Sequence, residues 1–338
     1  MLVKIIIALC LTFVLSAAVG PLILPWLRRL KFGQSILEIG PSWHKQKQGT
    51  PTVGGLIFII PILVITVILG WRDIFSNDLR LLYSLIFITL CGIIGFIDDY
   101  TKIKREHNKG LSVKQKTLLL TAAITLYIAA MYLSGYITTD FYIPFFNYNL
   151  HLSYFYFVIM IPFLFFFVNS VNLTDGLDGL ATSVTIPYAA AFCFVALMFN
   201  EQGKGNAGTA VLSAAAVGGL FAFLIFNFHP AKVFMGDTGS LFLGGLVVAL
   251  AMCYNRPYFI LIGGIVYLLE GLSVVLQVGF FKLTHGKRIF KMTPIHHHFE
   301  MCKWTEVVIV LVFTLVSLLA CGCALWGIIY EGLYTFNV

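Results

Sequence analysis

The sequence predicts an all-α integral membrane protein with about ten transmembrane helices. Of its 338 residues, 59% are hydrophobic and only 11% are charged, whereas soluble domains contain roughly 25% charged residues. The apolar residues are grouped into runs of roughly 20, the length that crosses a bilayer as a helix. Basic residues concentrate in alternate connections between these runs. These observations exclude a soluble globular protein, and we expect residues 1–338 to form a single polytopic membrane domain.

The apolar runs define the expected spans, of which the eighth is short. Residues 1–27 have neither a basic region before the apolar run nor a small-residue cleavage pattern, so we expect a retained span and not a signal peptide. The expected spans are residues 2–25, 53–70, 79–97, 117–135, 153–171, 181–199, 209–228, 239–254, 258–281 and 305–330.

The positions of Lys and Arg predict the orientation of the chain. Seventeen of the 22 basic residues fall in the connections on one side of the membrane, and five fall on the other. Basic loops stay in the cytoplasm, and an even number of spans places both termini on one side. We therefore expect both termini outside and an active site built from cytoplasmic loops.

Two adjacent carboxylates, Asp98 and Asp99, end the third span. The C-terminus of a helix already carries partial negative charge, which disfavours further negative groups. We therefore expect a cation opposite them, either a metal ion or the lysines that follow, beginning with Lys102. A solvated loop that begins with two acids is the alternative interpretation.

The other cytoplasmic connections supply further acids. The third, residues 169–179, has Asp-Gly steps at Asp175 and Asp178 and no basic residue. An ordinary Asx-rich turn would explain it, but such acids on a basic face favour a function. The fourth ends in Gly-Asp-Thr-Gly-Ser at 236–240, where glycines let backbone amides approach a phosphate. Asp237 can hold a divalent cation there, because oxygen ligands with substrate phosphates are the usual environment of magnesium.

The ninth span carries Glu270 near the middle of the membrane. An intramembrane carboxylate costs at least about 2.5 kcal/mol, so it normally has a partner or a task. A structural hydrogen bond and a role in the site both remain open. Three consecutive histidines follow at 296–298, and regular structure cannot aim all three at one point. Phosphate contacts by one or two imidazoles are therefore favoured over a three-histidine metal site.

The acidic residues come from three connections on the cytoplasmic face. The cationic and imidazole groups also come from three connections on that face. Carboxylates with a metal, ringed by lysines, suit phosphoryl transfer, in which catalysis is largely positioning and charge neutralisation. A site at the membrane surface further suggests that one reactant is an anionic lipid and the other a soluble phosphate ester.

Four strings carry a family resemblance: Gly-Phe-Ile-Asp-Asp-Tyr-Thr-Lys at 95–102, Asn-Leu-Thr-Asp-Gly-Leu-Asp-Gly at 172–179, Asn-Phe-His-Pro-Ala-Lys-Val-Phe-Met-Gly-Asp-Thr-Gly-Ser at 227–240, and Pro-Ile-His-His-His-Phe-Glu at 294–300. Over essentially its whole length the chain resembles the phospho-N-acetylmuramoyl-pentapeptide transferases. The acidic strings alone mark the wider polyprenyl-phosphate hexosamine-1-phosphate transferase superfamily. The histidine string and residues 44–55 narrow the resemblance to the peptidoglycan enzymes.

The resemblance implies a multi-pass enzyme of the bacterial cytoplasmic membrane. It implies transfer of phospho-MurNAc-pentapeptide from its UDP carrier to undecaprenyl phosphate, which gives UMP and the first lipid-linked peptidoglycan precursor. That reaction belongs to peptidoglycan biosynthesis and cell wall biogenesis, on which cell shape and cell division depend. The implied partners are both substrates, membrane lipid and a second copy in a homodimer, with no nucleic acid.

The resemblance also assigns roles to residues. Asp237 would bind Mg²⁺, and Asp98 would be the base that deprotonates the lipid phosphate. The implied catalytic residues are Asp98, Asp99, Asp237 and His296. The implied substrate-binding residues are Lys47, Lys102, Lys114, Asn172, Asp175, Gly176, Leu177, Asp178, Asn227, Phe234, Gln277, His297 and His298. Among them, Lys102 and residues 175–178 would surround the uridine, and Phe234 would stack on uracil.

Two alternatives remain open at this stage. A relative could use another UDP-hexosamine, such as UDP-GlcNAc, with the same lipid. A transporter of anionic nucleotides or lipids is the second alternative, but transporters carry structural repeats and midplane sites. This sequence has no internal repeat, and its polar residues, apart from Glu270, collect at one face.

Overall fold

The computed structural model describes residues 1–29, 49–105, 110–201 and 206–335, so Lys47 lies outside the described residues. Helices make up most of the described chain. The elements are α1 (Leu2–Arg29), α2 (Leu56–Ile74), α3 (Arg80–Lys104), α4 (Val113–Leu133), β1 (Asp140–Ile143), β2 (Tyr148–His151), α5 (Phe155–Thr174), α6 (Leu180–Glu201), α7 (Ala207–Asn227), α8 (Gly236–Cys253), α9 (Tyr258–Ile262), α10 (Ile265–Leu283), α11 (Ile295–Met301) and α12 (Glu306–Thr335).

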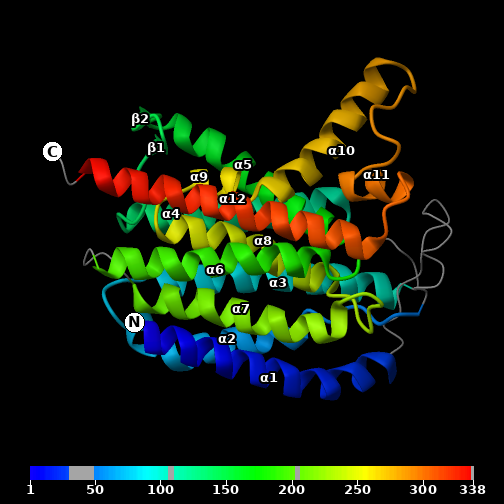
Figure 1. Ribbon diagram of the computed structural model, residues 1–338, viewed down its shortest axis with the longest axis horizontal. Helices are drawn as coiled ribbons and strands as arrows, with labels where there is room; N and C mark the ends of the chain where they lie inside the picture. The colour runs from blue at the N-terminus through cyan, green and yellow to red at the C-terminus, as the bar shows by residue number, and fades with distance from the viewer. Residues whose placement is uncertain (30–48, 106–109, 202–205, 336–338) are drawn as a thin grey trace.

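Among the described residues, ten helices are long and apolar enough to cross a membrane. This finding confirms the predicted all-α multi-pass architecture. The long helices lie roughly parallel, and the start of α1 lies at the same end of the bundle as the end of α12 (Figure 1). An even number of spans requires that arrangement. Which side of the membrane this end faces stays a prediction.

Several helices continue beyond the apolar runs that predict them. The expected third span ends at residue 97, but α3 continues to Lys104 and carries Asp98 and Asp99 in its last turns. Similarly, α5 continues to Thr174, so Asn172 lies on a helix and not in a loop. Asp98, Asp99 and Asn172 therefore lie in the last turns of helices and not in loops.

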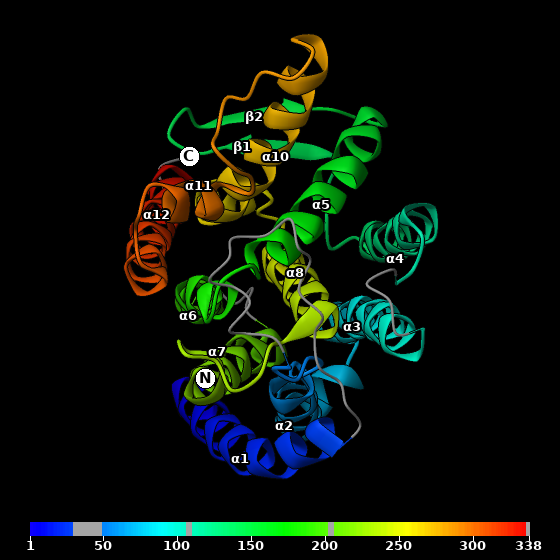
Figure 2. The same ribbon diagram turned by 90° about the vertical axis from the view of Figure 1, so that its right-hand side faces the viewer.

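The expected ninth span is interrupted. Short α9 ends at Ile262, the pair Gly263 and Gly264 follows, and α10 begins at Ile265. In Figure 2, α10 leans away from the other helices at its C-terminal end. The connection between α4 and α5 contains a feature that the sequence did not predict. There β1 and β2 form an antiparallel hairpin in which Asp140 pairs with His151.

Helix α8 forms the core of the bundle. Every residue of α8 from Thr238 to Cys253 is buried, as expected for a helix that is apolar on all sides. It packs against α3, α5 and α6 and lies at the centre of the view along the bundle (Figure 2). The first turn of α8, which carries Asp237, is thereby fixed among its neighbours.

Helices α3 and α8 come very close together near the site. A side-chain carbon added to Gly95 would overlap the backbone carbonyl of Asp237. Only glycine leaves room for that approach, since it has no Cβ. The close packing brings the last turns of α3, with Asp98 and Asp99, beside the first turn of α8.

Candidate active site

Three carboxylates meet where α3 ends and α8 begins. One oxygen from each of Asp98, Asp99 and Asp237 lies within 4.8 Å of the other two. Asp98 and Asp99 are each only 3% exposed. Three acids this close and this buried repel one another unless positive charge or hydrogen-bond donors compensate them.

Asp99 is compensated by the N-terminus of α8. Its Oδ1 accepts a hydrogen bond from the amide of Asp237 (3.1 Å), and its Oδ2 accepts from the amide (2.8 Å) and hydroxyl (2.7 Å) of Thr238. A carboxylate is favoured at this end of a helix. These two amides, which the sequence suggested for a phosphate, are instead engaged with Asp99.

Lys102 links the other two carboxylates. Its Nζ lies 2.6 Å from Oδ2 of Asp98 and 2.6 Å from Oδ2 of Asp237. The expected cation opposite the acid pair is therefore present as this ammonium group. Asp98 also accepts a hydrogen bond from the amide of Leu111 (2.7 Å), which ties the end of α3 to the start of α4.

Asp237 receives two further donors. The amide of Asn172 donates to Oδ1 of Asp237 (2.6 Å) and to the hydroxyl of Ser240 (2.7 Å), and Nζ of Lys116 lies 3.3 Å from Oδ2 of Asp237. The sequence did not indicate Lys116 or Ser240 as site residues. Lys114, which it did single out, is exposed in the first turn of α4.

This cluster fits a magnesium ion. Carboxylate and amide oxygens are the hard ligands that Mg²⁺ prefers. The Lys102 ammonium shows that Asp98 and Asp237 can share one cation, because it lies 2.6 Å from both. Asp99 is the least available of the three acids, because backbone amides of α8 hold both of its oxygens, whereas the donors to Asp237 are side chains that can move.

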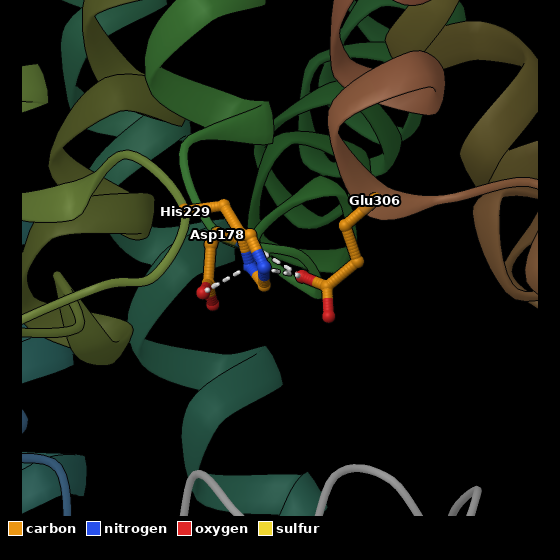
Figure 3. A group of neighbouring side chains, drawn as sticks. All are labelled: Asp178, His229 and Glu306. Atoms are coloured by element: carbon orange, nitrogen blue, oxygen red, sulfur yellow. Dashed lines mark hydrogen bonds and ion pairs between the residues drawn. The ribbon is translucent and has the colours of Figure 1, made fainter.

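Asp178 belongs to a second cluster, with His229 and Glu306 (Figure 3). Nδ1 of His229 lies 3.1 Å from Oδ2 of Asp178 and 3.7 Å from Oε2 of Glu306. The three side chains line a cavity of about 440 Å³, together with Glu300 and Trp304. Their ligand atoms lie close enough to hold a cation. The string at 227–240 contains His229, but nothing in the sequence indicated Glu306.

Asn227 and Gln277, which the family resemblance places near the nucleotide, both bind backbone segments in the structure. Asn227 is buried, accepts a hydrogen bond from the hydroxyl of Thr182 and donates to the carbonyl of Val233. Gln277 accepts from the amides of Ile289 and Phe290 and donates to the carbonyl of Phe290. These contacts fix the α7–α8 and α10–α11 connections.

The three histidines have three different partners. Nδ1 of His296 lies 2.9 Å from Oε2 of Glu270, and Nδ1 of His297 lies 2.6 Å from Oε2 of Glu300. Nδ1 of His298 accepts from the amide of Lys291 (3.1 Å). The three rings thus share no hydrogen-bond partner, although the ring centroids of His296 and His297 lie 4.2 Å apart. His296, an expected catalytic residue, has a fully buried ring.

The remaining expected nucleotide ligands lie in two connections. Asp175, Gly176 and Leu177 form the turn between α5 and α6, where Leu177 is buried. Phe234 is half-buried just before α8, and its backbone pairs with the carbonyl of Pro51 and the amide of Gly54, both at 2.9 Å.

Known proteins resemble this chain over most of its length. The glycosyl transferase family 4 profile matches residues 81–255. A phospho-N-acetylmuramoyl-pentapeptide-transferase of Clostridium botulinum (strain Alaska E43 / Type E3) is 46% identical over 316 residues, 93% of each chain. The enzyme of that name from Clostridium perfringens (strain 13 / Type A) is 44% identical over 325 residues, 95% of this chain and 98% of the relative. That of Acetivibrio thermocellus is 44% identical over 315 residues, 92% and 91% of the two chains.

Proposed function

This chain belongs to the family of phospho-N-acetylmuramoyl-pentapeptide transferases, and from that membership we propose the reaction that it catalyses. The enzyme transfers phospho-MurNAc-pentapeptide from UDP-MurNAc-pentapeptide to undecaprenyl phosphate. UMP leaves, and the lipid-linked product is the first membrane-bound precursor of peptidoglycan. The cofactor is Mg²⁺.

The observation that carries this proposal is that Asp98 and Asp237 both contact the same ammonium group, that of Lys102. The two acids come from α3 and α8, which are far apart in the sequence, and Lys102 lies 2.6 Å from both. Lys116 adds a second positive charge at 3.3 Å from Asp237. Carboxylates and lysines gathered in this way suit a reaction in which anionic groups must approach one another.

Asp237 would hold the magnesium ion beside Asp98, and the ion would supply positive charge against the diphosphate of the nucleotide. Asn172 orients Asp237 through its hydrogen bond to Oδ1. Asp99 fixes the first turn of α8 and so keeps Asp237 in place. Lys102 and Lys116 would offset the charge that gathers as the two phosphates meet.

Asp98 is the proposed proton acceptor for the lipid phosphate. A phosphate monoester has its second pKa at about 6, so the nucleophile needs little help from a base. Direct attack of the lipid phosphate on the sugar-linked phosphorus therefore requires no covalent intermediate on an aspartate. The lysines and the metal then provide the larger share of the rate enhancement.

The nucleotide would bind beside the α5–α6 turn. In this proposal residues 175–178 and Lys102 surround the uridine, Phe234 stacks on uracil, and Asn227 and Gln277 shape the pocket through the connections they hold. His297, His298, Lys47 and Lys114 would contact phosphates or the sugar. The proposal includes a site that faces the cytoplasm, where the soluble nucleotide is available, and a homodimer as the working form.

The direct test is UMP release by the purified full-length protein in lipid nanodiscs. With Mg²⁺ and undecaprenyl phosphate, we expect turnover of UDP-MurNAc-pentapeptide and none of UDP-GlcNAc. Asp237→Ala serves as the control and should lose the metal-dependent turnover. Turnover with UDP-GlcNAc alone would assign the chain to another hexosamine, and uptake of nucleotide without UMP release would show a transporter.

A further inference from the structure

Glu270 and His296 form a pair that is wholly enclosed by the protein. Both side chains are 0% exposed, and Nδ1 of His296 lies 2.9 Å from Oε2 of Glu270. Glu270 belongs to α10 and His296 to the short helix α11, so the pair joins two elements. A buried carboxylate of this kind requires a donor, and the imidazole N–H supplies it.

The other edge of the His296 ring faces the α5–α6 turn. A side-chain carbon on Gly176 would overlap Nε2 of His296. Within the described residues, Nε2 of His296 and Oε1 of Glu270 have no hydrogen-bond partner. The ring is therefore held from one side by Glu270 and lies directly against the backbone of Gly176 on the other.

Helix α10 contacts the chain that follows it at two points, one in the α10–α11 connection and one in α11. Gln277 binds the backbone of Ile289 and Phe290, and Glu270 binds His296. Positions 270 and 277 are two helical turns apart, so they lie on the same side of α10. One side of this helix thus contacts both the connection and α11, and the Glu270 contact reaches the α5–α6 turn through the ring of His296.

We propose that Glu270 is a positioning residue: its carboxylate orients the His296 ring, and the ring supports the backbone of Gly176 and with it the nucleotide loop, residues 175–178. This inference rests on the proposed function, which assigns that loop to the uridine. Glu270 acts through His296 and touches no substrate. His296 itself serves as the support and not as a proton-transfer group.

The hydrogen bond between Glu270 and His296 explains how Glu270 could position the ring. An ionised Glu270 accepts the Nδ1–H bond, which fixes the ring orientation and the position of the Nε2 edge. Without the charge, the buried imidazole N–H has a weaker acceptor, and the ring gains freedom to rotate. The Gly176 backbone then loses the surface against which it packs.

The test pairs hydrogen exchange with ligand binding in the full-length protein. Glu270→Gln keeps the size of the side chain and removes its charge. We expect faster amide exchange in residues 172–180 and UMP binding that is roughly tenfold weaker, the scale of a lost charge-assisted hydrogen bond. The KM for undecaprenyl phosphate should not change, whereas a general loss of structure would alter it.

Two further variants keep the test decisive. Gly176→Ala displaces the ring from the opposite side, so it should reproduce both effects, and combining it with Glu270→Gln should add little. Ser273→Ala is the matched control: Ser273 is also buried on α10, and its hydroxyl donates to the backbone carbonyl of Glu270. We expect its exchange and binding to equal those of the wild type.

Unchanged exchange of residues 172–180 in Glu270→Gln and in Gly176→Ala would overturn the proposal, as would fully additive effects. If Glu270→Gln does not fold, Gly176→Ala alone decides. If the wild type itself binds no UMP, faster exchange of residues 172–180 in the two variants would still support the positioning role. That result would reject the assignment of the loop to the nucleotide.

Discussion

At the residue scale, Asp98 and Asp99 are neighbours in sequence with different surroundings. Asp99 accepts three hydrogen bonds from Asp237 and Thr238. Asp98 accepts one amide bond, from Leu111, pairs with Lys102 and shares a side-chain hydrogen bond with Asp237. Asp99 therefore stabilises the start of α8, whereas Asp98 retains an oxygen that a substrate could reach in place of the lysine.

This difference gives a prediction for the two conservative amide variants. Asp98→Asn should lower kcat by about tenfold or more, because it removes the proposed proton acceptor and a charged contact to Lys102, and it should leave UMP affinity near that of the wild type. Asp99→Asn should mainly lower the thermal midpoint, because an amide accepts the α8 donors less strongly. Steady-state kinetics, UMP titration and thermal unfolding measure these effects. An Asp98→Asn enzyme with normal kcat and weak UMP binding would contradict the assignment.

Two lysines at the start of α4 provide a matched comparison. Lys116 lies 3.3 Å from Asp237, whereas Lys114 is exposed. Lys116→Ala should lower kcat/KM by about tenfold or more, since contacts of charged groups contribute roughly 1.5–3 kcal/mol. Lys114→Ala should have the smaller effect. Equal or reversed losses in the two alanine variants would reject the arrangement around Asp237.

The sequence identified the acids of the site better than it identified the lysines. Carboxylates at the ends of apolar runs are conspicuous, but a choice between Lys114 and Lys116 depends on the rotation of α4 about its axis. A signal for that rotation was present: Ser112 and Gln115 form a capping box that starts α4 at Val113. The S-x-x-Q pattern marks such a start in sequence. Glu306 gave no signal, because its partners come from other connections.

At the element scale, the contact between α3 and α8 positions the acids. A Cβ on Gly95 would overlap the backbone of Asp237, whereas a Cβ on Gly92, one turn earlier, would lie 3.4 Å from Phe242. The first contact requires the backbones to separate, and the second is an ordinary van der Waals distance. Packing at Gly95 is therefore linked to the geometry of the site.

The corresponding prediction compares Gly95→Ala with Gly92→Ala. Gly95→Ala should lower the free energy of unfolding by about 1–3 kcal/mol, as overpacking does, and should reduce Mg²⁺-dependent turnover because Asp237 moves away from Asp98. Gly92→Ala should be close to wild type in both. Thermal unfolding in detergent and UMP release provide the measurements. Full activity of Gly95→Ala would show that the close approach is not needed.

The boundaries of the spans were predicted less well than their number. Hydropathy locates the residues that lie in lipid, but it does not mark where backbone hydrogen bonding stops. For this reason α3 and α5 continue past their apolar runs to Lys104 and Thr174. The break before α10 coincides with Gly263 and Gly264, a pair that the sequence displays. The hairpin of β1 and β2 went unpredicted, since its strands are only four residues long.

At the scale of the whole molecule, the site exists because helices distant in sequence end together. The acids of α3 and α8, Asn172 of α5 and Lys116 of α4 all reach one point. The sequence predicted that these residues share a membrane face. It could not predict that they touch, since contact depends on the central placement of α8 among α3, α5 and α6 (Figure 2).

The orientation of the molecule gives a prediction at this scale. The excess of basic residues on the site face should hold that face in the cytoplasm, which leaves both termini outside. A full-length chain fused at its C-terminus to alkaline phosphatase should show phosphatase activity in cells, and the same fusion to green fluorescent protein should be dark. Fluorescence without phosphatase activity would reverse the orientation and place the site away from the soluble nucleotide.

The most direct test of the account is the location of the metal ion. Crystals of the full-length protein grown with Mn²⁺ in place of Mg²⁺, together with UMP, allow the ion to be found from its anomalous scattering. We predict a peak at coordination distance from Asp237 and beside Asp98, with uracil against Phe234. A peak only at Asp178, His229 and Glu306, or none near Asp237, would contradict the proposed site.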